Sequence, residues 1–535
     1  MAFDANLVEA TKFLDSFDGG QSPYPSVFFY VNRSPTIRFL APRYFDGNWL
    51  REDTAFINLP GDTGRDVYYL LAPTSLPGLM SHYFPDITAY ERPLAPDGTP
   101  AFTVYRVPAE RLKEAQIVRQ PVNAVFGEQL ELVGMVGDAG LSRGLSPGKS
   151  ADIGLLWRIL GDTNGVYSLF VHLIDEKGRL WAQQDVLGLK VEGWRKGDLV
   201  LSRHFVTTPP DAPPIPMRVV AGAALKPTGE RLRPATGDPG NLVKLRDTEV
   251  VRAGPPEIAD LPAPSRLVQR ELIPGLEVLG VELARNVIKV GEELDVEIVW
   301  RLIAPLAVEP LIEVRLSGDS GQTYARQEGI PAYGRYPFRR WMSGEVVRDP
   351  RSVRLTGPVS SARARPVLVA AHPGTGRRLG DLDLGQVDVQ DRSRNYTLPA
   401  PQRKLDVSFD GQIRLIGYDL EAETVPLNGE VGLTLYWQAV TSPSRNYTVF
   451  THLLDSGDAI VGQQDNPPVN GTLPTAGWAP GEVVVDPYRI KLKARPTAGE
   501  VSLEVGLYEP ASGAGLTIED TKDNRVLLER IKVRD

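Results

Sequence analysis

The chain has 535 residues, too many for one hydrophobic core, and its composition (42% hydrophobic, 24% charged) is typical of a soluble globular protein. The formal net charge of -8 argues against nucleic acid or an anionic membrane surface as the main partner. Cysteine is absent, which excludes disulfides, thiolate catalysis and zinc–sulfur sites.

Glycine (51 residues) and proline (46 residues) are both frequent, as expected of a β protein with many turns. No apolar run reaches the roughly 18–20 residues that cross a bilayer, so we expect no direct membrane insertion by this chain. The opening MAFDANLVEATKFLDSF lacks the features of a signal peptide. Taken as complete, the chain is predicted to be cytoplasmic; the alternative is a piece of a longer, exported or membrane-anchored protein.

Residues 1–118 are predicted to form a small α/β domain. Apolar residues at helical spacing indicate an amphipathic helix over 4–17. A second, short helix is expected over 75–84, and a hairpin over 87–107 turns at Pro96-Asp97-Gly98. The expected strands are 26–31, 35–42, 54–60 and 66–73.

The rest of the chain contains one pattern three times, in fixed register. Each copy has a tryptophan, a basic residue or histidine fifteen residues later, and a glutamine followed by an acid twelve residues beyond that. A second tryptophan then precedes a glycine–acid pair. The successive positions are Trp157, His172, Gln184 and Trp194; Trp300, Arg315, Gln327 and Trp341; Trp437, His452, Gln464 and Trp478. This many kept spacings predict three homologous domains.

Segments such as GLTLYW alternate apolar and polar residues, and YTVFTHLLD is rich in β-branched and aromatic residues. Seven or eight such strands per copy predict immunoglobulin-like or jelly-roll-like β-sandwiches, in a mainly β, multidomain chain. The expected sandwiches are 119–253, 268–392 and 405–535, joined by the Pro-rich linkers 254–267 and 393–404. The first tryptophan of each copy is interpreted as a plug between the two sheets.

A polar cluster recurs on neighbouring strands of two copies. It comprises His172, Gln184 and Asp185, and His452, Gln464 and Asp465. Such side chains can bind a metal or a sugar hydroxyl, or they can serve as a hydrogen-bonded framework that fixes the strand register. The second copy carries Arg315 instead of histidine, a replacement that favours the framework, and no metal site is predicted.

The second tryptophan of each copy follows a loop rich in Gly and Pro. There it either caps the end of the sandwich or stacks on a sugar ring through its apolar face. The candidates for carbohydrate contact are Trp194, Trp341 and Trp478, with Tyr333 and Tyr336 beside the second copy.

No catalytic residue and no cofactor are predicted. Glycoside hydrolysis needs two carboxylates that flank one bond, and spacing pairs none of the acids here. The sequence also has no G-x-S-x-G, HExxH or phosphate-loop pattern.

From YTVFTHLLD through VGQQD, AGWAPGEVVVDPYRI and VSLEVGLYEP, the third copy resembles a family. It is similar to the extracytoplasmic C-terminal β-sandwich modules of bacterial, Chloroflexi-like membrane glycosyltransferases of the protein O-mannosyltransferase and aminoarabinose-transferase type. The first 115 residues resemble the small soluble domain that follows the last membrane helix of such enzymes. The resemblance is strongest over 405–535 and weakest over 268–392.

The resemblance implies a soluble, extracytoplasmic tail whose catalytic membrane part is absent, so no catalytic residue is carried over. We therefore expect a non-catalytic accessory region that binds a glycan or a glycosylation acceptor beside the membrane domain of its own parent protein. The alternatives are a cell-surface structural or adhesion array of β-sandwiches and, third, a carbohydrate-active hydrolase with a site between the α/β domain and the first sandwich.

Overall fold

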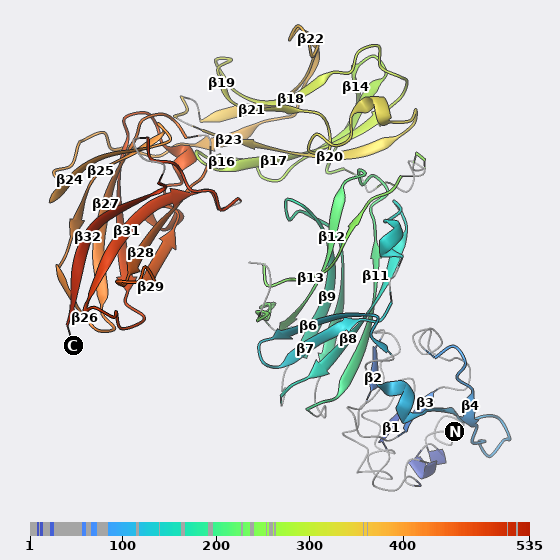
Figure 1. The fold of residues 1–535 in the computed structure, drawn as a ribbon. Coiled ribbons are helices and arrows are strands. Elements are labelled where there is room, and N and C mark those ends of the chain that lie inside the picture. Colours follow the sequence, from blue (N-terminus) through green and yellow to red (C-terminus); the bar gives the residue numbers. More distant parts are fainter. Residues whose placement is uncertain are drawn as a thin grey trace. The chain divides into compact units, whose positions relative to one another are not determined.

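The fold comes from a computed structural model of the chain (Figure 1). Before residue 84 it describes only 8–9, 11–13, 16, 22–25, 56–59 and 66–71. Beyond that point it describes the chain to residue 534, with gaps at 114–116, 138–139, 162–165, 191–195, 226–227, 236–239, 253, 256–260, 262–263, 357, 361, 444, 511 and 520–522. The chain divides into two compact units, Met1–Pro262 and Ala263–Asp535.

The described residues are mainly in β-strands that pair into several sheets, which confirms the predicted mainly β, multidomain class. The helical elements among the described residues are short 3-10 turns, a few helical residues between 8 and 16, and residue 117. The 3-10 turns are η4 (Ala109–Leu112), η5 (Leu141–Arg143), η7 (Phe338–Arg340), η8 (Pro468–Gly471) and η9 (Thr475–Gly477). Most of the predicted α/β domain, including the expected strands 26–31 and 35–42, lies outside the described residues.

The N-terminal segment contributes a four-stranded sheet in the order β1-β3-β5-β4. Its strands are β1 (Ser22–Pro25), β3 (Val67–Leu71), β4 (Ala89–Glu91) and β5 (Thr103–Val107). The predicted hairpin is present as the antiparallel pair β4–β5. Its turn is closed by Asp97, whose Oδ1 accepts hydrogen bonds from the Thr99 amide at 3.0 Å and hydroxyl at 2.7 Å.

The first sandwich has two sheets, β2-β11-β8-β7-β6 and β10-β9-β12-β13. The strands of the first sheet are β2 (Phe56–Leu59), β6 (Gln120–Phe126), β7 (Leu130–Met135), β8 (Ser150–Ile159) and β11 (Leu199–Thr207). Those of the second are β9 (Val166–Asp175), β10 (Leu180–Lys190), β12 (Pro216–Leu225) and β13 (Val243–Glu249).

The first sandwich shares a core with the N-terminal sheet. Strand β2 from the N-terminal segment pairs antiparallel with β11 and extends the sheet by one strand. Val67, Tyr69 and Phe84 pack in one buried cluster with Val133, Leu156 and Leu201 of the sandwich. The sequence predicts a one-sided strand for DIGLLW, but Leu155, Leu156 and Trp157 are all 0% exposed. Both faces of β8 are therefore covered, and the reason is the N-terminal layer.

Truncating Leu156 tests this shared core. Leu156→Ala is expected to lower the free energy of unfolding of the Met1–Pro262 unit by about 2–5 kcal/mol, because a buried leucine leaves a cavity. Leu180→Ala is the matched control in the same unit, since Leu180 is 45% exposed, and it is expected to change stability by no more than about 0.5 kcal/mol. Urea unfolding of the full chain measures both. Equal, small effects of the two substitutions would contradict the shared core.

The second and third sandwiches form the unit Ala263–Asp535. In the second, the sheets run β14-β15-β17-β20 and β16-β23-β21-β18-β19, with β22 paired to β21. Its strands are β14 (Arg266–Ile273), β15 (Leu276–Leu283), β16 (Val287–Lys289), β17 (Glu293–Leu302), β18 (Leu311–Gly318), β19 (Thr323–Gly329), β20 (Val346–Arg354), β21 (Arg363–Ala371), β22 (Arg378–Asp383) and β23 (Val387–Gln390).

In the third sandwich the sheets run β24-β25-β27-β30 and β26-β32-β31-β28-β29. Its strands are β24 (Arg403–Phe409), β25 (Ile413–Leu420), β26 (Thr424–Pro426), β27 (Glu430–Ala439), β28 (Thr448–Leu454), β29 (Ile460–Asn466), β30 (Val483–Lys491), β31 (Glu500–Tyr508) and β32 (Arg525–Arg534).

The three sandwiches share one strand order. The parallel pairs β16–β23 and β26–β32 occupy the same place in the second and third, and a parallel bridge between Leu145 and Val250 marks it in the first. The register agrees too, because the first tryptophan of each copy faces a valine on the next strand. The structure thus places equivalent repeat positions at equivalent points of one fold.

Candidate functional site

Each sandwich is built around a buried tryptophan whose indole N–H is bonded across two strands. Trp157, Trp300 and Trp437 are all 0% exposed, as expected of plugs between two sheets. Their Nε1 atoms donate to Ser202 Oγ at 3.1 Å, to Asp349 Oδ2 at 3.2 Å and to Asp486 Oδ2 at 3.2 Å. These acceptors occupy one repeat position on β11, β20 and β30. The bond satisfies an indole donor that would otherwise be orphaned in the core.

A third side chain, two residues further along the same strand, completes the network. It is His204 in the first sandwich, Arg351 in the second and Tyr488 in the third, and all three are buried. His204 Nε2 lies 2.9 Å from Ser202 Oγ, Arg351 Nε donates to Asp349 Oδ2 at 2.8 Å, and Tyr488 OH donates to Asp486 Oδ2 at 2.8 Å.

The carboxylates in this network also fix the loop before the second tryptophan. Asp349 Oδ1 accepts from the Ala332 amide at 2.9 Å, and Asp486 Oδ1 accepts from the Val469 amide at 2.8 Å. Ala332 and Val469 have φ of 54° and 53°, a left-handed conformation that costs a non-glycine residue about 1–2 kcal/mol. We infer that the buried carboxylate offsets this strain and so determines the path of the loop.

Burial changes the titration of these groups. It raises the pKa of Asp486 to about 6, although the bonds from Val469, Tyr488 and Trp437 oppose the rise. Burial, with the Asp486 charge beside it, also raises the pKa of Tyr488. Burial lowers the pKa of His204 to about 4, so this imidazole is neutral at pH 7.

Asp486 predicts a pH dependence of stability. The folded state holds the Asp486 proton more tightly than the unfolded chain does, where the pKa has its ordinary value of 3.8. Its contribution to stability is therefore fully present below about pH 4 and is lost as the pH rises to about 6, by on the order of 3 kcal/mol. The difference in unfolding free energy between wild type and Asp486→Asn should change by that amount between pH 4 and 6.5. A difference that stays constant over that range would contradict the shifted carboxyl.

The predicted polar cluster of the first sandwich is assembled only in part: His172 and Asp185 lie near each other, whereas Gln184 bonds the Phe205 amide of the other sheet. His172 Nε2 lies 3.7 Å from Asp185 Oδ1, and the imidazole stacks on Phe170 with ring centroids 4.6 Å apart. Burial lowers the pKa of His172, the Arg231 charge acts in the same direction, and Asp185 opposes both. The geometry favours an imidazole packed into the sheet.

The equivalent cluster of the third sandwich is more tightly bonded. His452 Nδ1 lies 2.9 Å from Glu504 Oε1, and His452 Nε2 lies 3.4 Å from Asp465 Oδ1. Arg525 donates to the other oxygen of Glu504 at 2.8 Å. The bond to Asp465 raises the pKa of His452, burial opposes the rise, and Glu504 adds to it. His452, Asp465, Glu504 and Arg525 form an ion-pair network. Glu504 and Arg525 were not predicted from the sequence, and the predicted Gln464 bonds the other sheet instead.

The repeated glutamine connects the two sheets of its sandwich. Gln184 Oε1 accepts from the Phe205 amide on β11, and Gln464 Oε1 accepts from the Arg489 amide on β30 at 2.7 Å. Phe205 and Arg489 hold the same repeat position. In the second sandwich Gln327 Oε1 instead accepts from Arg351 at 3.1 Å. This shared use explains why the glutamine keeps its spacing while the histidine does not.

The second sandwich replaces the histidine cluster with a local ion pair. Arg315 donates from Nε to Glu313 Oε1 at 2.7 Å and from Nη2 to Oε2 at 3.0 Å. Among the residues that the structure describes, no group of three or more His, Cys, Asp or Glu side chains is placed to hold a metal ion.

Two of the predicted carbohydrate-contact tryptophans are buried, which corrects that prediction. Trp341 is 7% exposed and Trp478 is 0% exposed. Their Nε1 atoms donate to the backbone oxygens of Tyr336 at 3.1 Å and Leu473 at 2.9 Å. An indole in this position offers no free face to a sugar, so the alternative, a cap at the end of the sandwich, describes both. Trp194 lies outside the described residues.

The two tyrosine candidates differ in accessibility. Tyr336 is buried, stacks on Trp341 and donates from its hydroxyl to Glu345 Oε1 at 2.7 Å. It belongs to the cap and does not present its ring to solvent. Tyr333 is half-buried.

The glycine–acid pair after the second tryptophan holds the cap in place. Glu345 Oε2 accepts from the Met342 amide at 2.7 Å, and Glu482 Oε2 accepts from the Ala479 amide at 2.9 Å. Both glutamates are buried. The repeated acid is therefore a structural residue in the second and third sandwiches.

The side chains that bond the core tryptophans were not predicted from the sequence. The sequence pattern that could have identified them is a polar residue at a strand position where alternation predicts a buried side chain. In VVRDPRS and VVVDPYR the aspartate falls on a buried position, 49 residues after the tryptophan in both copies. In the first sandwich serine takes that place after 45 residues, so spacing alone did not align the three positions.

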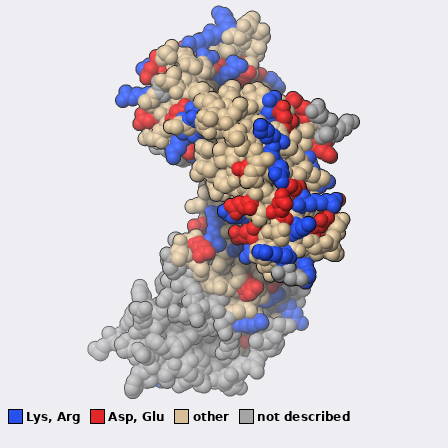
Figure 2. Space-filling view, turned by 90° about the vertical axis from the view of Figure 1, so that its left-hand side faces the viewer, with Lys and Arg blue, Asp and Glu red and all other residues tan. Residues whose placement is uncertain are grey.

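Among the described residues on the face that Figure 2 draws, acidic and basic side chains lie interspersed with uncharged ones. This mixture differs from the basic stripe on which nucleic-acid binding depends. In the described part of the chain, no helix has both the length and the apolar character needed to cross a bilayer.

Comparison with known proteins does not assign a family. No protein-family model matches the chain, and a search of curated proteins finds no match either.

Proposed function

We propose that this chain is a non-catalytic accessory region, the extracytoplasmic part of a membrane glycosyltransferase. Two observations support the proposal: the sequence resemblance, strongest over 405–535, and the tandem β-sandwich architecture. In this role the region presents a glycan or a glycosylation acceptor to the membrane domain of its own parent protein.

One observation carries the non-catalytic part of the proposal. The polar positions that the three copies share are engaged inside their own sandwich. The glutamine bonds the opposite sheet, the acid after it pairs with histidine in the first and third copies, and the buried aspartates bond tryptophan and loop. Groups used in this way stabilise a fold, whereas catalytic acids and bases must reach a substrate proton.

Because Trp341 and Trp478 are buried, fewer residues remain as candidates for the proposed contact with a glycan or acceptor. Of the predicted candidates, Tyr333 is half-buried, and the exposed Arg339 and Arg340 follow it on the same loop. An aromatic ring and guanidinium groups on one loop are suited to an acidic or hydroxylated glycan. We therefore place the contact on the 331–342 loop of the second sandwich, with Trp194 retained as a prediction.

The alternative, a cell-surface structural array, is favoured by the ordered linker between the second and third sandwiches. Arg392 and Arg394 both pair with Glu482 of the third sandwich, the latter at 3.4 Å. The Val483 amide donates to the Asn395 carbonyl at 2.7 Å. A linker held in this way is suited to a spacer. The third function considered, a hydrolase, has no comparable observation in its favour.

Glycan binding by the full chain tests the sugar-contact part. Calorimetric titration of the chain with mannosylated and acidic glycans is expected to show weak binding. Tyr333→Ala should lower the affinity at least about fivefold, because the stacking contact is lost. Tyr396→Ala is the matched control, since Tyr396 is 55% exposed and lies in the linker, and it is expected to bind as wild type does. Absence of binding by wild type would remove the glycan-contact role and leave the structural array.

The tail assignment has a separate test. The genomic reading frame upstream of Met1 is expected to continue into apolar membrane spans, with carboxylates in an early extracytoplasmic loop. Removing the region from that enzyme should lower transfer of sugar to the acceptor while leaving the membrane domain intact. Unchanged transfer would favour the structural array, and a gene that starts at Met1 would contradict the tail assignment.

A further inference from the structure

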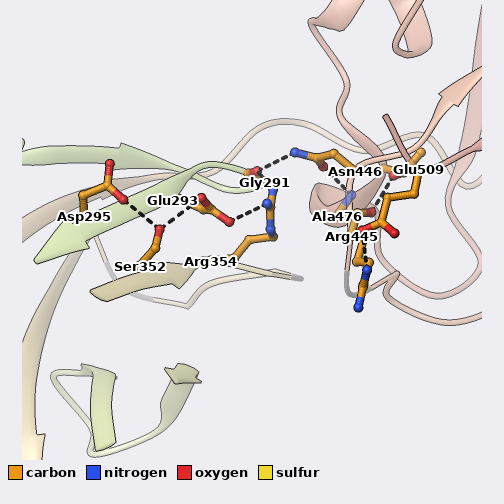
Figure 3. Close-up of polar contacts among 10 residues, drawn as sticks. Gly291, Glu293, Asp295, Ser352, Arg354, Arg445, Asn446, Ala476 and Glu509 are labelled. Carbon is orange, nitrogen blue, oxygen red and sulfur yellow. Dashed lines mark hydrogen bonds and ion pairs between the residues drawn. The ribbon is translucent and has the colours of Figure 1, made fainter. Parts of the chain in front are cut away.

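The second and third sandwiches touch at a contact made by two short backbone segments. One is the turn that joins β16 to β17, around Gly291. The other is the loop of the third sandwich that contains η9 and leads to Trp478. Figure 3 shows the two segments side by side, with Asn446 reaching from the third sandwich to Gly291.

The two segments approach so closely that a side chain on Gly291 or Gly477 would crowd the other segment. A Cβ atom on Gly291 would lie 2.7 Å from Pro474 Cγ and 3.3 Å from the Gly477 nitrogen. A Cβ atom on Gly477 would lie 3.1 Å from the Val290 carbonyl oxygen. Distances of this kind mark a site where one backbone packs directly against another.

Asn446 ties the contact together with both ends of its amide. Its Oδ1 accepts from the Ala476 amide at 3.1 Å, and its Nδ2 donates to the Gly291 carbonyl at 3.4 Å. The same carbonyl accepts from Arg354 of the second sandwich at 3.4 Å (Figure 3). Gly291 therefore joins one polar side chain from each sandwich.

Hydrogen bonds inside the third sandwich fix the conformation of the loop that makes this contact. Thr475 Oγ1 donates to the Arg445 carbonyl at 2.8 Å and accepts from the Tyr447 amide at 2.9 Å. Thr475, Ala476 and Gly477 are all buried. In the second sandwich the equivalent loop carries the exposed Arg339 and Arg340. Residues 475–477 are thus buried in the sandwich whose loop makes the contact, whereas the equivalent loop of the second sandwich has exposed residues.

The segment 391–394, where the second sandwich leads into the linker, adds a second connection between the two sandwiches. Asp391 Oδ2 accepts from the Val359 amide of the second sandwich at 3.0 Å. Its other oxygen pairs with Arg394 at 2.7 Å, and Arg394 in turn reaches Glu482 and, at 3.5 Å, the Gly477 carbonyl. The bonds run without a break from one sandwich through the linker to the other.

Comparison of the three repeats shows which property of Gly291 the turn requires and which the contact requires. Nine residues before the core tryptophan stand Gly148, Gly291 and Asn428, with φ of 72°, 96° and 64°. A left-handed residue is thus required in all three turns, and asparagine serves in the third. A Cβ atom on Gly148 would meet only Pro210, at 3.8 Å. Only Gly291 must lack a Cβ because of a neighbouring sandwich.

We propose that this contact is a docking interface that fixes the second and third sandwiches as one rigid body. The turn at Gly291 is the inserted element, and the loop 474–477 with Asn446 receives it. The two sandwiches then act as an arm of constant length, which holds whatever the third sandwich contacts at a set distance from the second. The interface goes beyond the proposed function and does not depend on it.

Double electron–electron resonance, which measures the distance between two spin labels, tests the interface on the full chain. The chain has no cysteine, so Ser320→Cys on the second sandwich and Ala498→Cys on the third accept spin labels without background. Both positions are exposed. We expect one narrow distance distribution, which Gly291→Asn broadens roughly twofold because Cβ displaces Pro474, since linked domains move relative to each other when their interface is lost.

Gly148→Asn is the matched control, because it places the same residue in the same kind of turn without a neighbour in the way. It should leave the distribution unchanged. Asn446→Ala should broaden the distribution without adding any atom to the turn, and circular dichroism checks that each variant stays folded. A broad distribution in the wild type, or a narrow and unshifted one in folded Gly291→Asn, would overturn the rigid interface.

Discussion

Each sandwich depends on one buried hydrogen bond, from an indole N–H in one strand to a polar side chain in the next. A tryptophan fills the space between two sheets well, but its N–H must find an acceptor there. The acceptors Ser202, Asp349 and Asp486 come from the strand that pairs with the tryptophan's own strand. The bond therefore links core filling to strand register, and in two sandwiches the second carboxylate oxygen extends it to a loop.

The acceptor of this bond is buried, and the three copies differ in how they avoid or compensate a buried charge there. Serine with a neutral His204 brings no charge into the core of the first sandwich. In the second, Asp349 is buried together with Arg351, which also bonds three other acceptors. In the third, Asp486 has only neutral donors, so burial raises its pKa to about 6. The shared position therefore holds chemically different groups: the pKa of His204 beside Ser202 is lowered to about 4, and that of Asp486 is raised to about 6.

The sequence predicts features that repeat with the period of a strand, and it predicts less about features that depend on neighbours. Alternation and the spacing of Trp157, Trp300 and Trp437 are local signals, so the sandwiches and their core plugs follow from them. The burial of Trp478 depends on Leu473, Glu482 and the fold of its own loop, so a Gly/Pro-rich stretch gives no sign of it. Leu156 is similar: its second covered face comes from residues almost ninety positions earlier.

Differences among the copies are informative because the common fold supplies the reference. Where Asn428 and Gly291 share a left-handed turn, the fold explains the turn, and only a neighbouring sandwich explains the glycine. The same comparison separates the repeated glutamine (Gln464 in the third copy), which joins the two sheets in every copy, from Glu504, which meets His452 only in the third. Residues that depart from the repeat without a reason inside their own sandwich are therefore where contacts with other parts of the chain, and with partners, are to be sought.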